Sequence, residues 1–144
     1  MSIVSNLLDS KGHHVLTVTP DATVHKAIEQ MAAIAAGTAL VMDGGKVVGI
    51  FSERDVTRKV ELQEKDINKV FVKDIMTTEL TTITLETSLD DCMQLMTNKR
   101  IRHLPVLNNG SLCGIVSIGD VVKYLIVEKD FKIKNLETYI SGAL

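Results

Sequence analysis

The sequence has no tryptophan and few aromatic residues of any kind, with three Phe and two Tyr among 144 residues. It also lacks a long apolar run: the longest, residues 31–42, is interrupted by Gly37 and Thr38 and is too short to span a bilayer. The first six residues lack the basic and apolar regions of a secretory signal. These absences predict a cytoplasmic protein that does not bind or cross a membrane.

A charge excess of one sign is missing as well. The formal net charge is −2, and the sequence pI is near 6.1. No overall field would attract a polyanion, so nucleic acid is not an expected partner. Hydrophobic residues make up 45% of the chain and charged residues 24%, which is the composition of a globular protein rather than a disordered one.

Catalytic and metal-binding patterns are also absent. There is no P-loop, no GxGxxG and no recognisable Ser-His-Asp arrangement, and neither Cys92 nor Cys113 has the context of a nucleophile. Free cysteines are commonly buried, which favours a structural role for both. His13 and His14 are adjacent, and no carboxylate or cysteine pattern completes a ligand set. The sequence therefore predicts neither an enzyme nor a metal site.

The chain does contain an internal repeat. Residues 49–56 read G-I-F-S-E-R-D-V and residues 114–121 read G-I-V-S-I-G-D-V, 65 positions later. The same offset carries Met31 onto Met96 without a gap. One repeat of about 60 residues buries too little surface to be comfortably stable alone, so we expect the two halves to fold as one unit.

Hydrophobic spacing and turn residues predict the same order of elements, β-α-β-β-α, in each half. The first half is expected to contain strands at 15–19, 39–42 and 46–51, a helix near 24–31, a turn at 43–45 and a helix from Ser52. The second half is expected to contain strands at 81–84, 104–107 and 112–117, a helix near 89–99, a turn at 108–110 and a helix from Gly119. A short helix at 2–12 precedes the repeats, and a tail rich in helix formers follows them.

Two copies of G-I-x-S-x-x-D-V, each after a strand and an amphipathic helix, resemble the tandem CBS pair, or Bateman module, named after cystathionine β-synthase. The segments S-E-R-D at 52–55, R-I-R-H-L-P-V at 100–106 and S-I-G-D-V-V at 117–122 resemble the small stand-alone proteins of this family most. The resemblance implies an α/β fold in which two β-α-β-β-α motifs are related by a pseudo-twofold axis. The expected divisions are 1–60 for the first helix and motif, 61–78 for a connecting segment, 79–127 for the second motif and 128–144 for a helical extension.

The resemblance also implies sites for an adenosine ligand in the cleft between the motifs. In such pairs the motif Asp accepts hydrogen bonds from the ribose hydroxyls, which suits an acceptor-only carboxylate. Carried onto this sequence, site one comprises Thr17, Thr38, Ala39, Ser52 and Asp55, and site two comprises Thr82, His103, Leu104, Ser117 and Asp120. Neighbouring motif positions complete the candidate set: Arg54, Arg102, Pro105, Ile118 and Gly119.

The two sites are not expected to be equivalent. Arg102-His103 stands where the first copy has Gly37-Thr38, and basic side chains at such positions resemble phosphate contacts. We therefore expect the site containing Asp120 to hold an anionic tail more strongly. The expected ligand is AMP, with ADP, ATP, NAD or S-adenosylmethionine as alternatives.

Two interpretations of the Ser-x-x-Asp pairs stay open. A serine followed three residues later by an acid at the start of a helix is also a capping box. The first interpretation gives a regulatory module that binds adenosine compounds and signals through a homodimer or a regulated protein partner. The second gives a structural dimerisation module in which Ser52 and Ser117 serve only as caps.

Overall fold

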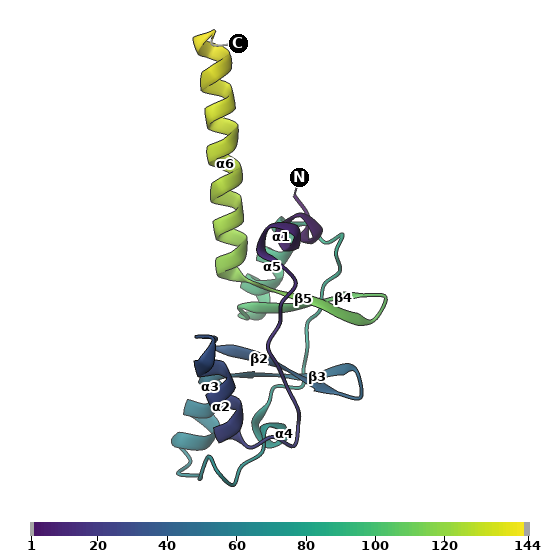
Figure 1. The fold of residues 1–144 in the computed structure, drawn as a ribbon, viewed down its shortest axis with the longest axis vertical. Helices are drawn as coiled ribbons and strands as arrows, with labels where there is room; N and C mark the ends of the chain where they lie inside the picture. The colour runs from purple at the N-terminus through teal and green to yellow at the C-terminus, as the bar shows by residue number, and fades with distance from the viewer. Residues whose placement is uncertain (1, 143–144) are drawn as a thin grey trace.

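The computed structural model describes residues 2–142 and shows two stacked halves, from which one long helix projects (Figure 1). The first half follows α1 (Val4–Lys11) and contains β1 (Thr17–Val18), α2 (Val24–Ala33), β2 (Thr38–Asp43), β3 (Lys46–Ser52), α3 (Glu53–Val56) and the π-helical turn η1 (Thr57–Glu61). The second half contains α5 (Leu89–Lys99), β4 (His103–Asn108), β5 (Ser111–Ser117) and α6 (Ile118–Ser141), and α4 (Val72–Ile75) lies between the halves in the chain. The predicted α/β class and the order of hairpins and helices are confirmed.

The two hairpins pair residue for residue in the same way. Thr38 is opposite Ser52 in the first, and His103 is opposite Ser117 in the second. Both also contain a register shift at the equivalent place, after Val41 and after Val106. The repeated spacing therefore extends from the sequence to the backbone hydrogen bonds.

The helix that precedes each hairpin begins with a side-chain cap. Thr23 accepts a hydrogen bond from the backbone N–H of Lys26 before α2, and Ser88 accepts one from that of Asp91 before α5. Each cap satisfies one of the free N–H groups of the first turn. Apolar residues then recur along one face, which packs against the hairpin of the same half.

The second half lacks a named strand over 81–84, where the sequence predicts one. Only Ile83 pairs there, through a parallel bridge to Val106. In the first half the backbone N–H of Leu40 donates to the carbonyl of Leu16 and so extends the ladder. The equivalent residue of the second half is Pro105, which has no N–H, so the matching bond cannot form. In the first half, β1 pairs with β2 over two residues, giving a three-stranded sheet.

Each half is completed by the helix that precedes the other half in the chain. Val4, Leu7 and Leu8 of α1 are buried in the core of the second half, although α1 precedes the first half in the chain. Val72 and Ile75 of α4 are buried in the core of the first half. The chain thus crosses between the halves, and the sequence-based grouping of the first helix with residues 1–60 does not correspond to its packing.

The helix of the second motif and the predicted tail helix form one continuous element. α6 is 24 residues long, and its first turns pack on α1 and α5 while the remainder extends away from the body (Figure 1). Residues 143–144 of the predicted extension lie outside the described residues.

Candidate functional site

The start of α3 holds the first Ser-x-x-Asp pair in a fixed geometry. Asp55 Oδ2 accepts hydrogen bonds from the backbone N–H of Ser52 at 3.0 Å and from its hydroxyl at 3.2 Å. The backbone N–H of Asp55 donates to Ser52 Oγ at 3.3 Å. Both bonds of a capping box are therefore present, and Asp55 is the one buried charged residue of the described chain, 8% exposed.

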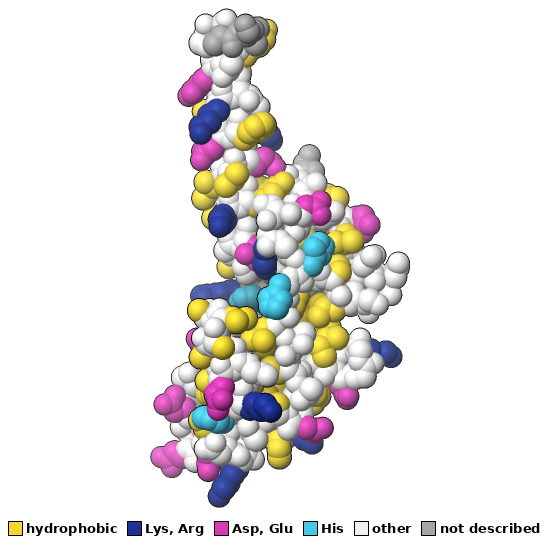
Figure 2. Space-filling view, in the orientation of Figure 1, with side chains coloured by type: hydrophobic (Ala, Val, Ile, Leu, Met, Phe, Trp, Pro, Cys, Tyr) yellow, Lys and Arg dark blue, Asp and Glu magenta, His cyan; other side chains and the backbone are white. Residues whose placement is uncertain are grey.

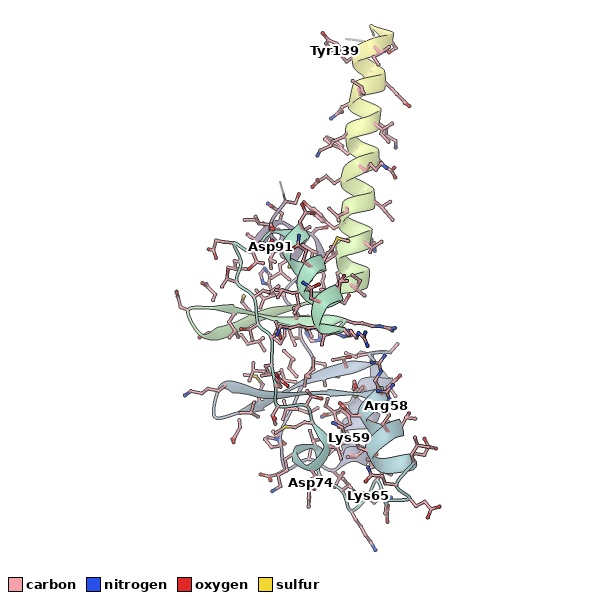
Figure 3. All side chains as sticks on the ribbon, turned by 180° about the vertical axis from the view of Figure 1, so that it is seen from behind. Arg58, Lys59, Lys65, Asp74, Asp91 and Tyr139 are labelled. Carbon is pink, nitrogen blue, oxygen red and sulfur yellow. The ribbon has the colours of Figure 1, made fainter. Side chains whose placement is uncertain are left out.

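A lysine on the same helical segment approaches the other carboxylate oxygen of this aspartate. Lys59 Nζ lies 3.1 Å from Asp55 Oδ1 and also donates to the carbonyl of Ile75 at 2.8 Å. Figure 3 shows Lys59 on the helical side of the first half. The ammonium offsets the cost of burying the carboxylate, and it adds a cation beside the motif.

A cavity of about 370 Å³ opens next to Asp55, between the two halves. Its volume lies within the range of sites that bind small molecules. The first half supplies Thr38, Ser52 and Asp55, and the second supplies Arg102 and His103. The cavity is further lined by Gly37, Ile50, Glu53, Arg54, Thr77, Glu79, Leu80, Thr81, Arg100, Ile101 and Pro105.

Basic side chains concentrate on one side of this cavity. A neighbouring cavity of about 420 Å³ shares Arg54, Arg100, Ile101 and Arg102 with it and is otherwise lined by Met96, Thr97 and Ile118. Figure 2 shows basic and histidine side chains at the level where the two halves meet. Guanidinium groups from both halves thus surround a space that a phosphate could enter.

His103 lies where the two motifs meet. It pairs with Ser117 across the second hairpin and also lines the Asp55 cavity. Burial lowers the pKa of the imidazole below its ordinary value; the charge of Asp120 opposes this, and those of Lys11 and Arg102 reinforce it. The ring is therefore neutral near pH 7, and an anion placed beside it would favour its protonation.

The second Ser-x-x-Asp pair has the same cap and a different lysine. The backbone N–H of Ser117 donates to Asp120 Oδ2 at 2.9 Å, and Lys11 Nζ from α1 lies 2.5 Å from the same oxygen. Burial would raise the pKa of Asp120, but the hydrogen bonds from Lys11 and Ser117 and the lysine charge outweigh it and hold the pKa below its ordinary value. Asp120 lines a separate cavity of about 530 Å³ between α1 and α6.

Some of the predicted residues lie at more than one place. Arg102 and His103, which the sequence assigns with Asp120, line the Asp55 cavity together with Pro105. His103 also lies beside the second motif, because it pairs with Ser117 and the charge of Asp120 acts on its pKa. Ala39 and Leu104 are buried in the cores of their halves. Among the other candidates, Ile118 lines the arginine-rich cavity, Gly119 is exposed at the start of α6, Thr17 is exposed on β1, and Thr82 lines a surface cavity near α5.

Several residues of the site were not predicted from the sequence. The contact of Lys59 with Asp55 could have been inferred from the sequence, because Lys59 follows Asp55 by four positions on a helix and so shares its face. The contact of Lys11 with Asp120 could not, because 109 residues separate the two. Arg100 and Thr77 reach the cavity only through the stacking of the two halves.

The cysteines lack the properties of a reactive thiol. Burial, with a smaller contribution from the charge of Asp91, raises the pKa of Cys92 to about 11. Burial also raises the pKa of Cys113, whose Sγ donates to the carbonyl of Val106. Both thiols are therefore protonated near neutral pH and are poor nucleophiles.

Two further findings concern residues 2–142 only. No group of three or more His, Cys, Asp or Glu side chains in this part of the chain is placed to hold a metal ion. No helix within it combines the length and apolar character needed to cross a bilayer.

The two copies of the motif correspond to the matches of a family model. The model that describes the CBS domain matches twice, over residues 8–62 and 72–127. The chain belongs to the CBS domain family. These two matches leave the distal part of α6 outside either domain.

Relatives of similar size support this membership. The chain is 38% identical over 148 aligned residues to the mitochondrial CBS domain-containing protein CBSX3 of Arabidopsis thaliana, covering 96% of this chain and 72% of the relative. A solved signal-transduction protein with CBS domains from Burkholderia ambifaria MC40-6 is 43% identical, with a TM-score of 0.84 and coverage of 88% of this chain and 95% of that one. Small stand-alone CBS proteins are thus its homologues.

A more distant structure shows the same fold with ligands bound. The CBS domain pair of protein MJ0100, solved in complex with 5′-methylthioadenosine and S-adenosyl-L-methionine, has a TM-score of 0.76 and 20% identity. The alignment covers 89% of this chain and 98% of that one. At this identity the likeness shows the shared fold.

Proposed function

We propose that this CBS pair is a regulatory module that binds an adenosine compound with an anionic tail, AMP being the first choice, in the cavity beside Asp55. The observation that carries the proposal is that Ser52 and Asp55 of one half face the same cavity as Arg102 and His103 of the other. A carboxylate suits a ribose diol, and guanidinium groups suit phosphate. One ligand would therefore contact both halves at once.

The charge of the cavity wall favours an anionic tail over a cationic one. Arg54, Arg100 and Arg102 line both the Asp55 cavity and the adjoining one, whereas Glu53 and Glu79 line only the Asp55 cavity. S-adenosylmethionine carries a positive sulfonium, which these arginines would repel. AMP, ADP, ATP and NAD all place phosphate on the basic side when the ribose is at Asp55.

The Asp120 motif is proposed as the weaker site. A lysine ammonium contacts each carboxylate, Lys11 at Asp120 and Lys59 at Asp55, so a ribose would compete with a lysine at either motif. The difference lies in the arginines, which line the Asp55 cavity and not the cavity beside Asp120. The two motifs should thus show one tighter and one weaker class of binding.

Binding can regulate only if the ligand has different affinities for two arrangements of the protein. The ligand would contact both halves, and the helix after each motif begins at the bound Ser-x-x-Asp pair. We propose that occupancy changes the arrangement of a homodimer, or the affinity for a regulated protein partner, through these helices. No reaction of the ligand is part of the proposal.

A structural dimerisation module is the second candidate, and the complete capping boxes favour it. Both serines and both aspartates already satisfy each other without a ligand. On this interpretation the two carboxylates act only as helix caps, and the protein functions without a ligand in the cavity.

Calorimetry with AMP, ATP, NAD and S-adenosylmethionine separates the two candidates. Asp55→Asn should weaken AMP by about ten- to a hundredfold, because one charge-assisted hydrogen bond contributes about 1.5–3 kcal/mol, and asparagine still caps a helix. Asp120→Asn is the matched control and should leave the tighter class nearly unchanged. Absence of binding by every compound, or equal AMP affinity in parent and Asp55→Asn, would favour the structural module.

A further inference from the structure

The distal part of α6 carries an apolar face that nothing in the described residues covers. Figure 1 shows the helix extending beyond the body, and Figure 3 shows Tyr139 near its far end. Large apolar side chains along it are between 43% and 74% exposed: Val122, Ile126, Val127, Phe131, Ile133, Leu136, Tyr139 and Ile140. A helix with such a face normally packs it against another element.

Most of these residues follow a coiled-coil spacing. Positions 122, 126, 129, 133, 136 and 140 are separated alternately by four and three residues, which is the a/d pattern of a heptad repeat. Ile126, Ile133 and Ile140 occupy a positions, and Val122 and Leu136 occupy d positions. Isoleucine at all three a positions, with leucine at the d position 136, favours a parallel two-stranded coil.

The remaining apolar residues have a different environment. Val127 and Phe131 line the cavity between α1 and α6 together with Leu7. They lie outside the a/d positions and face the protein's own first helix. The a/d seam is therefore a separate surface, available to a second molecule.

Charged residues beside the a/d seam favour pairing with a second copy of the helix that runs in the same direction. In a parallel pair, Lys132 at g faces Glu137 at e of the second copy, which is an attractive contact. Lys129 is a charged residue at d, and its side chain packs next to Asp130 at e of the second copy. A full-length antiparallel overlap would instead bring Asp130 near Asp130 and Lys132 near Lys132, both of which are repulsive.

We propose that residues 122–140 of α6 bind the same segment of a second copy as a parallel, in-register, two-stranded coiled coil. The paired motifs of both chains then lie at the same end of the coiled coil, and each Asp120 motif lies where its helix begins. Lys129 fixes the register at some cost in stability, as a polar residue in a coiled-coil seam does. This coiled coil rests on the homodimer of the proposed function. It specifies which surface of each chain forms the dimer and that the two helices run in the same direction.

Disulfide trapping tests the direction. Leu136→Cys places a thiol at a d position, and Thr138→Cys, two residues later, places one on the outer face as the matched control. Oxidation should link Leu136→Cys into a dimer much faster than Thr138→Cys. The parent protein gives the baseline, since Cys92 is buried and Cys113 is partly buried. An antiparallel pair would hold the two introduced thiols about 15 Å apart, given the helical rise per residue, and would not link them.

Sedimentation equilibrium supplies the second measurement. Lys129→Leu should lower the dimer dissociation constant by about tenfold or more, and Ile133→Asp should raise it by a similar factor, because each changes the seam alone. Both positions are exposed beyond the body, so circular dichroism should show an intact fold. A dimer in which Leu136→Cys fails to link, or which neither variant affects, overturns the coiled coil and leaves the proposed self-association standing. A monomeric parent protein overturns both.

Discussion

At the scale of single residues, the two motif aspartates are held by lysines of different origin. Lys59 comes from the same helical segment as Asp55, whereas Lys11 reaches Asp120 from α1. The 65-residue offset carries Lys11 onto Met76 and Lys59 onto Tyr124, so neither lysine has a counterpart in the other copy. The repeat has conserved the carboxylate geometry within this chain while the cation that balances it changed position.

Lys11→Met should raise the pKa of Asp120. Burial remains in the variant, while the hydrogen bond and charge that lower the pKa are lost. The lowered pKa gives the parent protein stability above the ordinary value of 3.8 that is lost as the pH falls through the folded value. The variant should lose this contribution. Carboxyl titration by NMR, with acid unfolding curves, measures both effects.

Lys123→Met is the control for this prediction. Lys123 lines the same cavity and has no ion-pair partner among residues 2–142. Its replacement should leave the titration of Asp120 nearly unchanged. An equal shift in both variants would mean that general charge, rather than the Lys11 contact, sets the pKa.

At the scale of elements, much of the fold could be predicted because its signals are local. The turns at 43–45 and 108–110 follow from Gly and Asn at positions with positive φ, and α5 was predicted with its observed bounds. The strand predicted over 81–84 is reduced to a bridge at Ile83, because Pro105 stands where the first half has Leu40 and lacks the N–H that would extend the ladder. The packing of α1 on the second half is set by tertiary contacts that no periodicity encodes.

The repeated glycine of each motif lies where another segment crosses its strand closely. A Cβ at Gly114 would lie 2.9 Å from Leu8 Cδ1, and one at Gly49 would lie 2.6 Å from Met76 Sδ. Such distances are shorter than carbon and sulfur atoms tolerate without movement of the neighbour. The motif glycine is therefore explained by the crossing of α1 and of the segment after α4.

Gly114→Ala should lower the free energy of unfolding by about 1–3 kcal/mol, since Leu8 is fully buried and has little room to move. Gly119→Ala is the matched control, because its Cβ would meet only Ser117 Oγ at 3.8 Å. At that helical position alanine should stabilise the protein by about 0.4–1 kcal/mol. Urea denaturation measures both variants, and equal destabilisation by the two would contradict the proposed clash.

At the scale of the whole molecule, the crossing of α1 and α4 joins two cores into one unit. Each half is completed by the helix that precedes the other half in the chain. The candidate cavity lies at the junction of these halves, where the sequence places it, and many of its lining residues were predicted, but not which residues of the two halves share it. The repeat offset identifies which residues are equivalent, whereas the cavity is lined by inequivalent residues that face each other.

Leu8→Ala should therefore destabilise both halves together. Removing this buried side chain should lower the free energy of unfolding by about 2–5 kcal/mol. Hydrogen exchange followed by mass spectrometry should show reduced protection in β2 and β3 as well as in β4 and β5. Ser10→Ala, at an exposed position of the same helix, should change little. Loss of protection confined to the second half would contradict a single cooperative unit.

Because α6 is long, a small rotation where it begins produces a large displacement at its far end. With 24 residues the helix is about 36 Å long, and it begins at Ser117, whose partner Asp120 lies in the first turn. A tilt of about 10° at this base would displace the far end by about 6 Å, for a rigid rod of the helical rise. If the proposed ligand tilted the second motif in this way, a shift of less than an ångström near the carboxylate would become a displacement of several ångströms at the far end of the helix.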